Sequence, residues 1–155
     1  MTPTRSGGKG QDILGIIRHM PNRRSETELD DLVEVAKGLA HPGRLRLLAM
    51  LAGGELCVCQ MTAILALAPS TVSQHLSVLS RGGLVAERKE GKLVFYRLRD
   101  EGAGATLLPP LLGLLAADST VKSDRNLVAR LRRVPVATLC AAELDLVAVG
   151  VRVAS

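Results

Sequence analysis

The spacing of apolar positions predicts a chain that begins with amphipathic helices. Apolar residues recur at three- and four-residue intervals after Ser25, which forms a capping box with Glu28, so a helix is expected to start there. Pro42 interrupts this stripe and suits the first turn of a second, short helix that ends near Gly53. This part of the chain is therefore expected to be helical.

Two further short helices, over residues 55–65 and 69–81, form a helix-turn-helix pattern. At about 100° per residue, Val72, Leu76 and Leu79 share one face of the second helix, and small polar groups occupy the other. Such groups can read base edges in a DNA groove. The residues expected to contact DNA from this helix are Ser70, Thr71, Ser73, Gln74, Ser77 and Arg81.

A two-stranded hairpin is predicted directly after the helix-turn-helix. Residues 84–88 and 93–98 are β-type runs, and the polar residues 89–92 form the turn between them. After a helix-turn-helix, such a hairpin is interpreted as a wing. Three of its cations, Arg88, Lys89 and Lys92, are expected to contact the DNA backbone or minor groove and to add affinity more than sequence choice.

The ends of the chain are less regular. Residues 1–24 contain Gly7-Gly8-Lys9-Gly10 and are expected to be a flexible arm. Residues 106–117 are apolar nearly all round, so this helix needs a cover, and a second subunit would supply one. The sequence thus predicts a winged helix-turn-helix domain with dimerisation helices over 25–133, mainly α with a small β-hairpin, and a tail, 134–155, whose structure it does not predict.

Composition narrows the partners and the location. The net charge of +5 and pI of 9.6 favour a polyanionic partner, here double-stranded DNA. Three cysteines are poor material for a disulfide framework and indicate a reducing compartment, so the cytoplasm is expected. No apolar run is long enough for a membrane span. An enzyme is not expected, because His41 and His75 have structural explanations and no glycine-rich phosphate loop is visible.

Two thiols stand at the start of the predicted third helix, at Cys57 and Cys59. Trivalent arsenic and antimony, cadmium and lead prefer thiolate ligands, which a helix N-terminus favours. Residues two apart on a helix point about 200° apart, so binding one ion through both sulfurs should deform that helix. This helix supports the helix over residues 69–81, which is expected to read the DNA bases. Binding of the ion and binding of DNA are therefore expected to weaken each other.

These residues together resemble the ArsR/SmtB family of metalloregulatory repressors, over roughly residues 29–118. The resemblance implies a homodimeric winged-helix repressor that leaves its operator when a toxic metal or metalloid binds. It is carried by His41-Pro42-x-Arg44, Glu55-Leu56-Cys57-Val58-Cys59, Ser70-Thr71-Val72-Ser73-Gln74-His75-Leu76, Gly83-Leu84-Val85 and the stretch from Gly91-Lys92 to Tyr96.

The inducer expected from the resemblance is As(III) or Sb(III), with Cd(II) or Pb(II) less favoured because residues 1–24 contain no cysteine. The commonest arsenite pattern has a third cysteine where this chain has Thr62. Cys140 is the only other thiol and is a candidate third ligand, although a buried structural cysteine or a small exogenous thiol are alternatives. A further alternative is a redox sensor in which Cys140 is the resolving thiol.

Overall fold

The computed structural model describes residues 25–151, so the expected N-terminal arm, residues 1–24, lies outside the described part of the chain. The chain divides into two compact units, residues 1–30 and 31–155. The described part of the first unit is the beginning of one helix, α2. The account below concerns the second unit.

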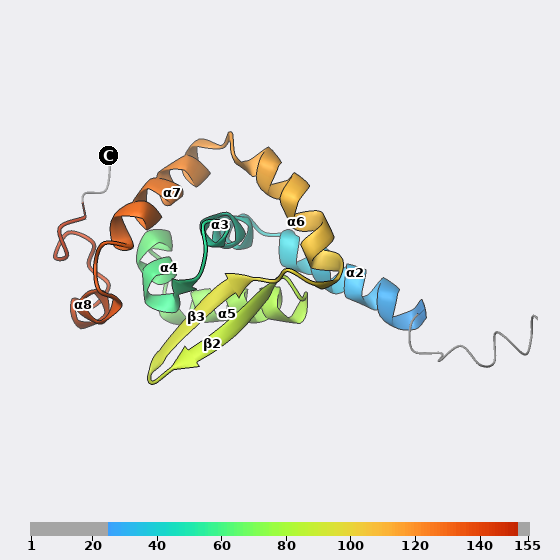
Figure 1. Cartoon of the computed structure of the whole chain (residues 1–155), viewed down its shortest axis with the longest axis horizontal. Coiled ribbons are helices and arrows are strands. Elements are labelled where there is room, and N and C mark those ends of the chain that lie inside the picture. The colour runs from blue at the N-terminus through green and yellow to red at the C-terminus, as the bar shows by residue number, and fades with distance from the viewer. Residues whose placement is uncertain (1–24, 152–155) are drawn as a thin grey trace, which may run out of the picture. The chain divides into compact units, whose positions relative to one another are not determined.

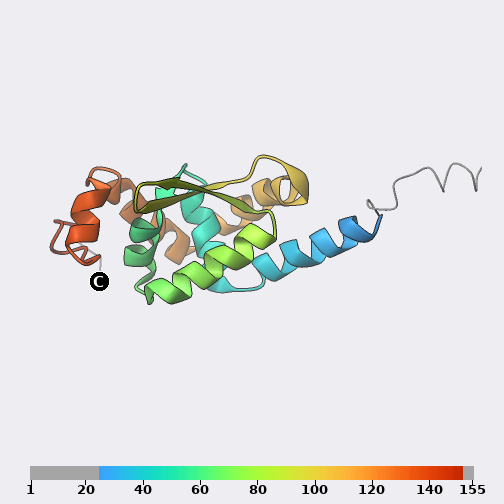
Figure 2. The ribbon, with the colours of Figure 1, turned by 90° about the horizontal axis from the view of Figure 1, so that it is seen from below.

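Helices dominate the described residues, and the small sheet lies in the middle of the chain (Figures 1 and 2). The predicted class, mainly α with a winged helix-turn-helix, is confirmed. The elements in chain order are α2 (Ser25–Leu39), α3 (Pro42–Leu51), β1 (Leu56–Cys57), α4 (Val58–Leu65), α5 (Pro69–Arg81), β2 (Val85–Glu90), β3 (Leu93–Leu98), α6 (Gly102–Leu115), α7 (Ser119–Leu131) and α8 (Val136–Ala141).

The wing is part of a three-stranded antiparallel sheet with the order β1-β3-β2. Leu56 pairs with Tyr96 and Cys57 with Phe95, so the two residues before α4 form a strand. The prediction that the third helix begins at residue 55 was therefore wrong by three residues, and the predicted two-stranded hairpin has a third strand. The reason is non-local, because pairing with β3 satisfies backbone groups that an isolated segment would satisfy by helix formation.

Side-chain caps hold the junction between α2 and α3. The His41 Nδ1 accepts a hydrogen bond from the Gly43 amide at 3.0 Å, which caps α3. Arg44 donates to the carbonyl oxygens of Gly38 at 2.9 Å and Lys37 at 2.7 Å, the last turn of α2. The His41-Pro42-x-Arg44 motif is thus a helix junction in this fold.

The core is aliphatic and gathers around α3. Leu47 and Leu48 are fully buried, and α3 packs on α7, with one charged pair joining the two helices. Arg46 donates to both carboxylate oxygens of Asp124, at 2.7 and 2.8 Å, and Asp124 is only 2% exposed. This bidentate ion pair fixes the position of α3 relative to α7.

The C-terminal residues complete the core. Leu139 on α8, and Leu146 and Val151 after it, are all buried, and α8 packs on α4. Glu143 and Leu144 have positive φ, at 52° and 67°, which turns the chain back after the six-residue helix. A short helix followed by turns has little periodicity, which explains why the sequence predicted no structure for this tail.

The apolar helix α6 begins at Gly102 and ends at Leu115, earlier at both ends than the predicted 106–117. The first turn is tightly packed, since a methyl group on Gly104 would lie 3.1 Å from the Gly83 carbonyl oxygen. Leu107 and Leu114 are 40% and 80% exposed. No single described helix meets the length and composition needed to cross a membrane, although α6 and α7, bent by 104°, do so as a pair.

Candidate nucleic-acid interface and thiol site

The helix α5 presents the polar face that its sequence predicts. Val72, Leu76 and Leu79 are fully buried against the core, and α4 packs on α5 as the first helix of the pair. The residues predicted to contact DNA lie on the other side: Ser70, Ser73, Gln74, Ser77 and Arg81 are exposed, and Thr71 is half-buried. The Ser77 hydroxyl donates to the Ser73 carbonyl at 2.9 Å, so its oxygen lone pairs remain as acceptors.

His75 lies between these two faces. Its ring contacts that of His41, with 4.4 Å between the ring centroids. Burial, then the nearby His41 and Arg44, lower the pKa of His75 below its usual value. This ring contact joins the start of α3 to α5.

The predicted wing cations differ in their surroundings. Arg88 forms ion pairs with Glu55 at 2.6 Å and Glu90 at 2.7 Å and lies 4.7 Å from the centre of the Phe95 ring. Hydrogen bonds to these two carboxylates raise the pKa of Arg88. Lys89 lies 4.0 Å from Glu87, and Lys92 is exposed in the turn between β2 and β3.

Arg88 stays protonated, and its positive charge is balanced by the carboxylates of Glu55 and Glu90. The sequence alone did not predict these ion pairs. Glu55 is 33 residues away along the chain and reaches Arg88 only because β1 joins the sheet. On the other side of the wing, Tyr96 donates to Glu87 at 3.0 Å, and burial together with this bond raises the pKa of Tyr96 to about 12.

The three cysteines lie in different settings. Cys57 is buried at the end of β1, in extended backbone, and its amide donates to the Gln60 side chain at 2.9 Å. Cys59 lies in the first turn of α4, and its sulfur is joined to that of Cys140 on α8 as a disulfide. The Cα atoms of this pair are 6.2 Å apart, across 81 residues of sequence. The structure therefore brings together Cys59 and Cys140.

The expected helical strain between Cys57 and Cys59 does not apply, because Cys57 precedes the helix. Within residues 25–151, no group of three or more histidine, cysteine or carboxylate side chains is placed to hold a metal ion. Cys57 and Cys59 do line one cavity of about 320 Å³, between the start of α4, α5 and the wing. Leu76 and Tyr96 also line this cavity, so a change at the thiols would reach both candidate DNA-contacting elements.

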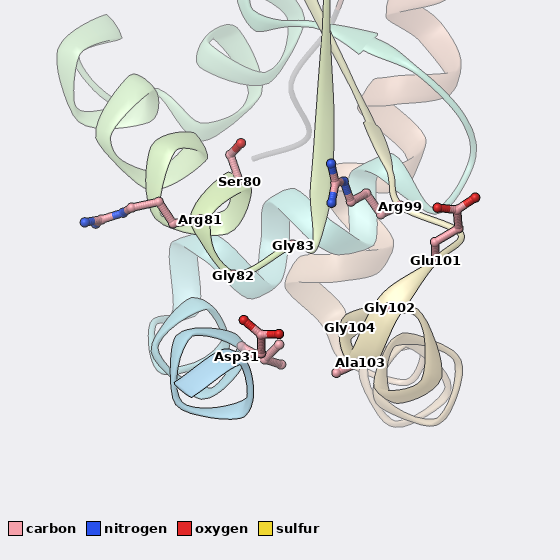
Figure 3. A pocket seen from close by; sticks show the side chains of 11 residues that line it. Asp31, Ser80, Arg81, Gly82, Gly83, Arg99, Glu101, Gly102, Ala103 and Gly104 are labelled. Atoms are coloured by element: carbon pink, nitrogen blue, oxygen red, sulfur yellow. The ribbon is translucent and has the colours of Figure 1, made fainter. Parts of the chain in front are cut away.

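A second cavity, of about 220 Å³, lies where α2, the end of α5 and the start of α6 meet (Figure 3). Its glycines allow close packing, since a methyl group on Gly82 would lie 2.8 Å from the Glu34 carbonyl oxygen. Figure 3 shows Asp31 directed toward Gly82 and Gly83, while Arg81 points away from them. The charged groups do not converge, so this cavity is a helix junction without a binding constellation.

Comparison with known proteins matches the region just described. The model of the bacterial regulatory protein arsR family matches residues 41–87, from the α3 cap to β2. A biofilm growth-associated repressor of Agrobacterium fabrum is 38% identical over 101 residues, which make up 65% of this chain and 86% of that protein.

Two metal-resistance regulators match shorter stretches. A cadmium resistance transcriptional regulatory protein homolog of Staphylococcus aureus is 42% identical over 46% of this chain and 60% of its own length. An arsenic resistance transcriptional regulator of Pseudomonas putida is 41% identical over 43% of this chain and 53% of its own length.

Solved structures agree with the fold. The homodimeric winged helix-turn-helix DNA-binding domain Mb0332 of Mycobacterium bovis superimposes with a TM-score of 0.52 at 33% identity, over 63% of this chain and 89% of that domain.

Proposed function

This chain belongs to the ArsR family of bacterial regulatory proteins and is a DNA-binding transcriptional repressor rather than an enzyme, and we propose that a disulfide between Cys59 and Cys140 controls its affinity for DNA. The reduced protein binds the operator, and oxidation weakens that binding. The observation that supports this proposal is the direct pairing of these two sulfurs, one on the first helix of the reading pair and the other on α8.

The chemistry of the switch balances with a peroxide as the oxidant. The Cys59 or Cys140 thiolate attacks the peroxide and breaks its O–O bond, which gives a sulfenic acid and expels hydroxide or alkoxide, and this anion is protonated to water or an alcohol. The other thiolate then attacks the sulfenic sulfur, and the disulfide forms with loss of hydroxide, which is protonated to water. Two electrons pass from the two sulfurs to the peroxide, and a thiol reductant reverses the reaction.

The switch reaches DNA through α4. Cys59 lies in the first turn of α4, which packs on both α5 and α8. The disulfide requires the Cys59 and Cys140 sulfurs to remain in contact, and the dithiol form releases this constraint on the first turn of α4. Since α4 supports the reading helix, the two redox states differ in how α5 is held, and by linkage DNA must in turn disfavour oxidation.

The test is operator binding by fluorescence anisotropy, with promoter DNA of the protein's own gene, before and after peroxide treatment. We expect oxidation to weaken binding by about tenfold or more, a coupling typical of allosteric sites. Cys59→Ser and Cys140→Ser should bind DNA but ignore peroxide, and dithiothreitol should restore wild-type binding. Cys57→Ser is the matched control and should respond as wild type. If Cys59→Ser still releases DNA on oxidation, the proposal fails.

A second candidate is induction by As(III), Sb(III) or, less favoured, Cd(II) or Pb(II). It is supported by the cavity that Cys57 and Cys59 share and by the names of the arsenic and cadmium regulators that the chain resembles. In this alternative Cys57, Cys59 and Cys140 act as thiolate ligands once the disulfide is reduced. Arsenite added to the reduced protein separates the candidates: release that needs Cys57 as well as Cys59 supports the metalloid.

For the DNA complex, we propose a homodimer that places two α5 helices in successive major grooves of a palindromic operator. The homodimeric state of the Mycobacterium bovis domain supports this arrangement. The base-reading residues are Ser70, Thr71, Ser73, Gln74, Ser77 and Arg81, and the wing contributes Lys89, Lys92 and, more weakly, Arg88.

A further inference from the structure

The helix α7 has a cationic outer face that neither the reading helix nor the wing explains. Lys122 and Arg125 on α7, and Arg132 and Arg133 directly after it, are exposed, and the only acidic residue of α7, Asp124, is buried and paired with Arg46. α4 packs on both α7 and α5 and lies between them in Figure 1, so α7 is on the far side of α4 from the candidate DNA-reading helix.

A cavity of about 310 Å³ lies under this face, between α7 and the end of α3. Its lining combines two arginines with small and apolar side chains, and no carboxylate is among the described residues that line it. The lining residues are Ala49, Met50, Ala52, Gly53, Arg125, Val128, Ala129 and Arg132.

One of the two guanidinium groups is held in place before any ligand arrives. Arg132 donates to the Gly53 carbonyl oxygen at 2.9 Å. A methyl group on Gly54 would lie only 3.2 Å from the same nitrogen, and the φ of +118° at Gly54 also favours glycine. The Gly53–Gly54 turn therefore lets the guanidinium lie against the backbone, with further N–H donors of its five left over.

We propose that this cavity binds a small organic carboxylate. The carboxylate accepts hydrogen bonds from Arg132 and Arg125, and its apolar part packs on Met50 and Val128. The volume equals that of about ten water molecules at ~30 Å³ each, which suits a short-chain acid rather than a macromolecule. Burying the apolar lining distinguishes such a ligand from a simple inorganic anion.

This site is independent of the thiol pair, because its lining contains no cysteine. It does adjoin the turn that leads into β1, and Arg132 already bridges α7 to that turn. A bound carboxylate would strengthen the bridge without requiring any change in the Cys59 and Cys140 sulfurs.

The test uses the full chain and two probes of equal length, hexanoate and hexylamine, in ¹H–¹⁵N NMR titrations. We expect saturable shifts of the Gly53, Gly54 and Val128 amides with hexanoate, and none with hexylamine. Arg125→Gln should weaken hexanoate binding by about tenfold, the usual effect of losing a charge-assisted hydrogen bond. Lys122→Gln, on the same helix but outside the lining, is the matched control and should bind hexanoate as wild type does.

Arg132→Gln is a second variant and should also weaken hexanoate binding, and its circular dichroism spectrum checks that the helices still fold. Equal binding of hexylamine, or unchanged hexanoate affinity in Arg125→Gln, would overturn the proposal. So would competition between promoter DNA and hexanoate together with a shallower salt dependence of DNA binding in Arg125→Gln, because the basic face would then be a DNA contact. Binding of hexanoate to both reduced and oxidised protein is expected, whatever the outcome at the thiols.

Discussion

Single residues acquire their roles in this protein through a neighbour that is distant in sequence. His75 is a member of the reading helix, but its ring rests on His41, the cap of α3. Cys59 and Cys140 meet across 81 residues, and Arg88 is neutralised by Glu55 across 33. In each case the side chain that decides the role is supplied by another element.

The His75 and His41 contact makes folding stability depend on pH. Burial and the charges of His41 and Arg44 lower the folded-state pKa of His75 below its ordinary value of 6.5. The unfolded chain therefore binds a proton first as the pH falls, so this contribution is complete above pH 6.5 and is lost as the pH drops toward the lower folded value.

Urea unfolding of wild type and His75→Gln between about pH 5 and pH 8 checks this expectation. The free energy of unfolding of wild type should fall more steeply on the acid side than that of the variant. Parallel pH profiles would show that His75 does not titrate differently in the folded state.

At the scale of elements, the pair between Arg46 and Asp124 joins α3 to α7. Removing the buried carboxylate leaves a partly buried guanidinium without its partner, so Asp124→Ala should lower the free energy of unfolding by about 3 kcal/mol. The double variant Arg46→Met/Asp124→Leu should lose less, because neither charge remains to be desolvated. Urea denaturation measures both, and an equal or larger loss in the double variant would contradict this reading.

Lys92 and Arg88 of the wing should contribute differently to the salt dependence of DNA binding, because only Arg88 has two carboxylate partners. Lys92→Gln is expected to reduce the salt slope of DNA binding by about one, because the variant lacks the cation proposed to contact a phosphate. Arg88→Gln should change that slope less, because the carboxylates of Glu55 and Glu90 already balance its charge. The measurement is the operator association constant as a function of salt concentration. Gln74→Ala is the control for base reading, with altered sequence preference and an unchanged slope.

At the scale of the whole molecule, the exposed leucines of α6 indicate where a second subunit is expected. Leu114 is 80% exposed, and Leu107, two helical turns earlier, is 40% exposed. Leu114→Glu should raise the dimer dissociation constant and weaken operator binding in parallel, since two reading helices then act separately.

Sedimentation equilibrium measures the dimer dissociation constant. Val147→Glu is a matched control, because Val147 is also apolar and 74% exposed but lies in the C-terminal tail. An unchanged dimer in Leu114→Glu would place the subunit contact elsewhere.

The sequence alone determined the elements whose signals are local. The stripe of α2, the prolines Pro42 and Pro69 at helix starts, the two faces of α5 and the wing strands all follow from spacing within one segment. These signals were enough to predict the fold class and the exposed polar face of α5. The motifs in these same segments also indicated the family.

Tertiary structure decided what depends on contacts between distant segments. Leu56 and Cys57 form a strand because β3 offers an unpaired edge, Cys59 meets Cys140 because α8 folds back on α4, and the tail after Val134 enters the core. Spacing within a segment cannot report these contacts, because each is set by the packing of two elements that lie far apart along the chain.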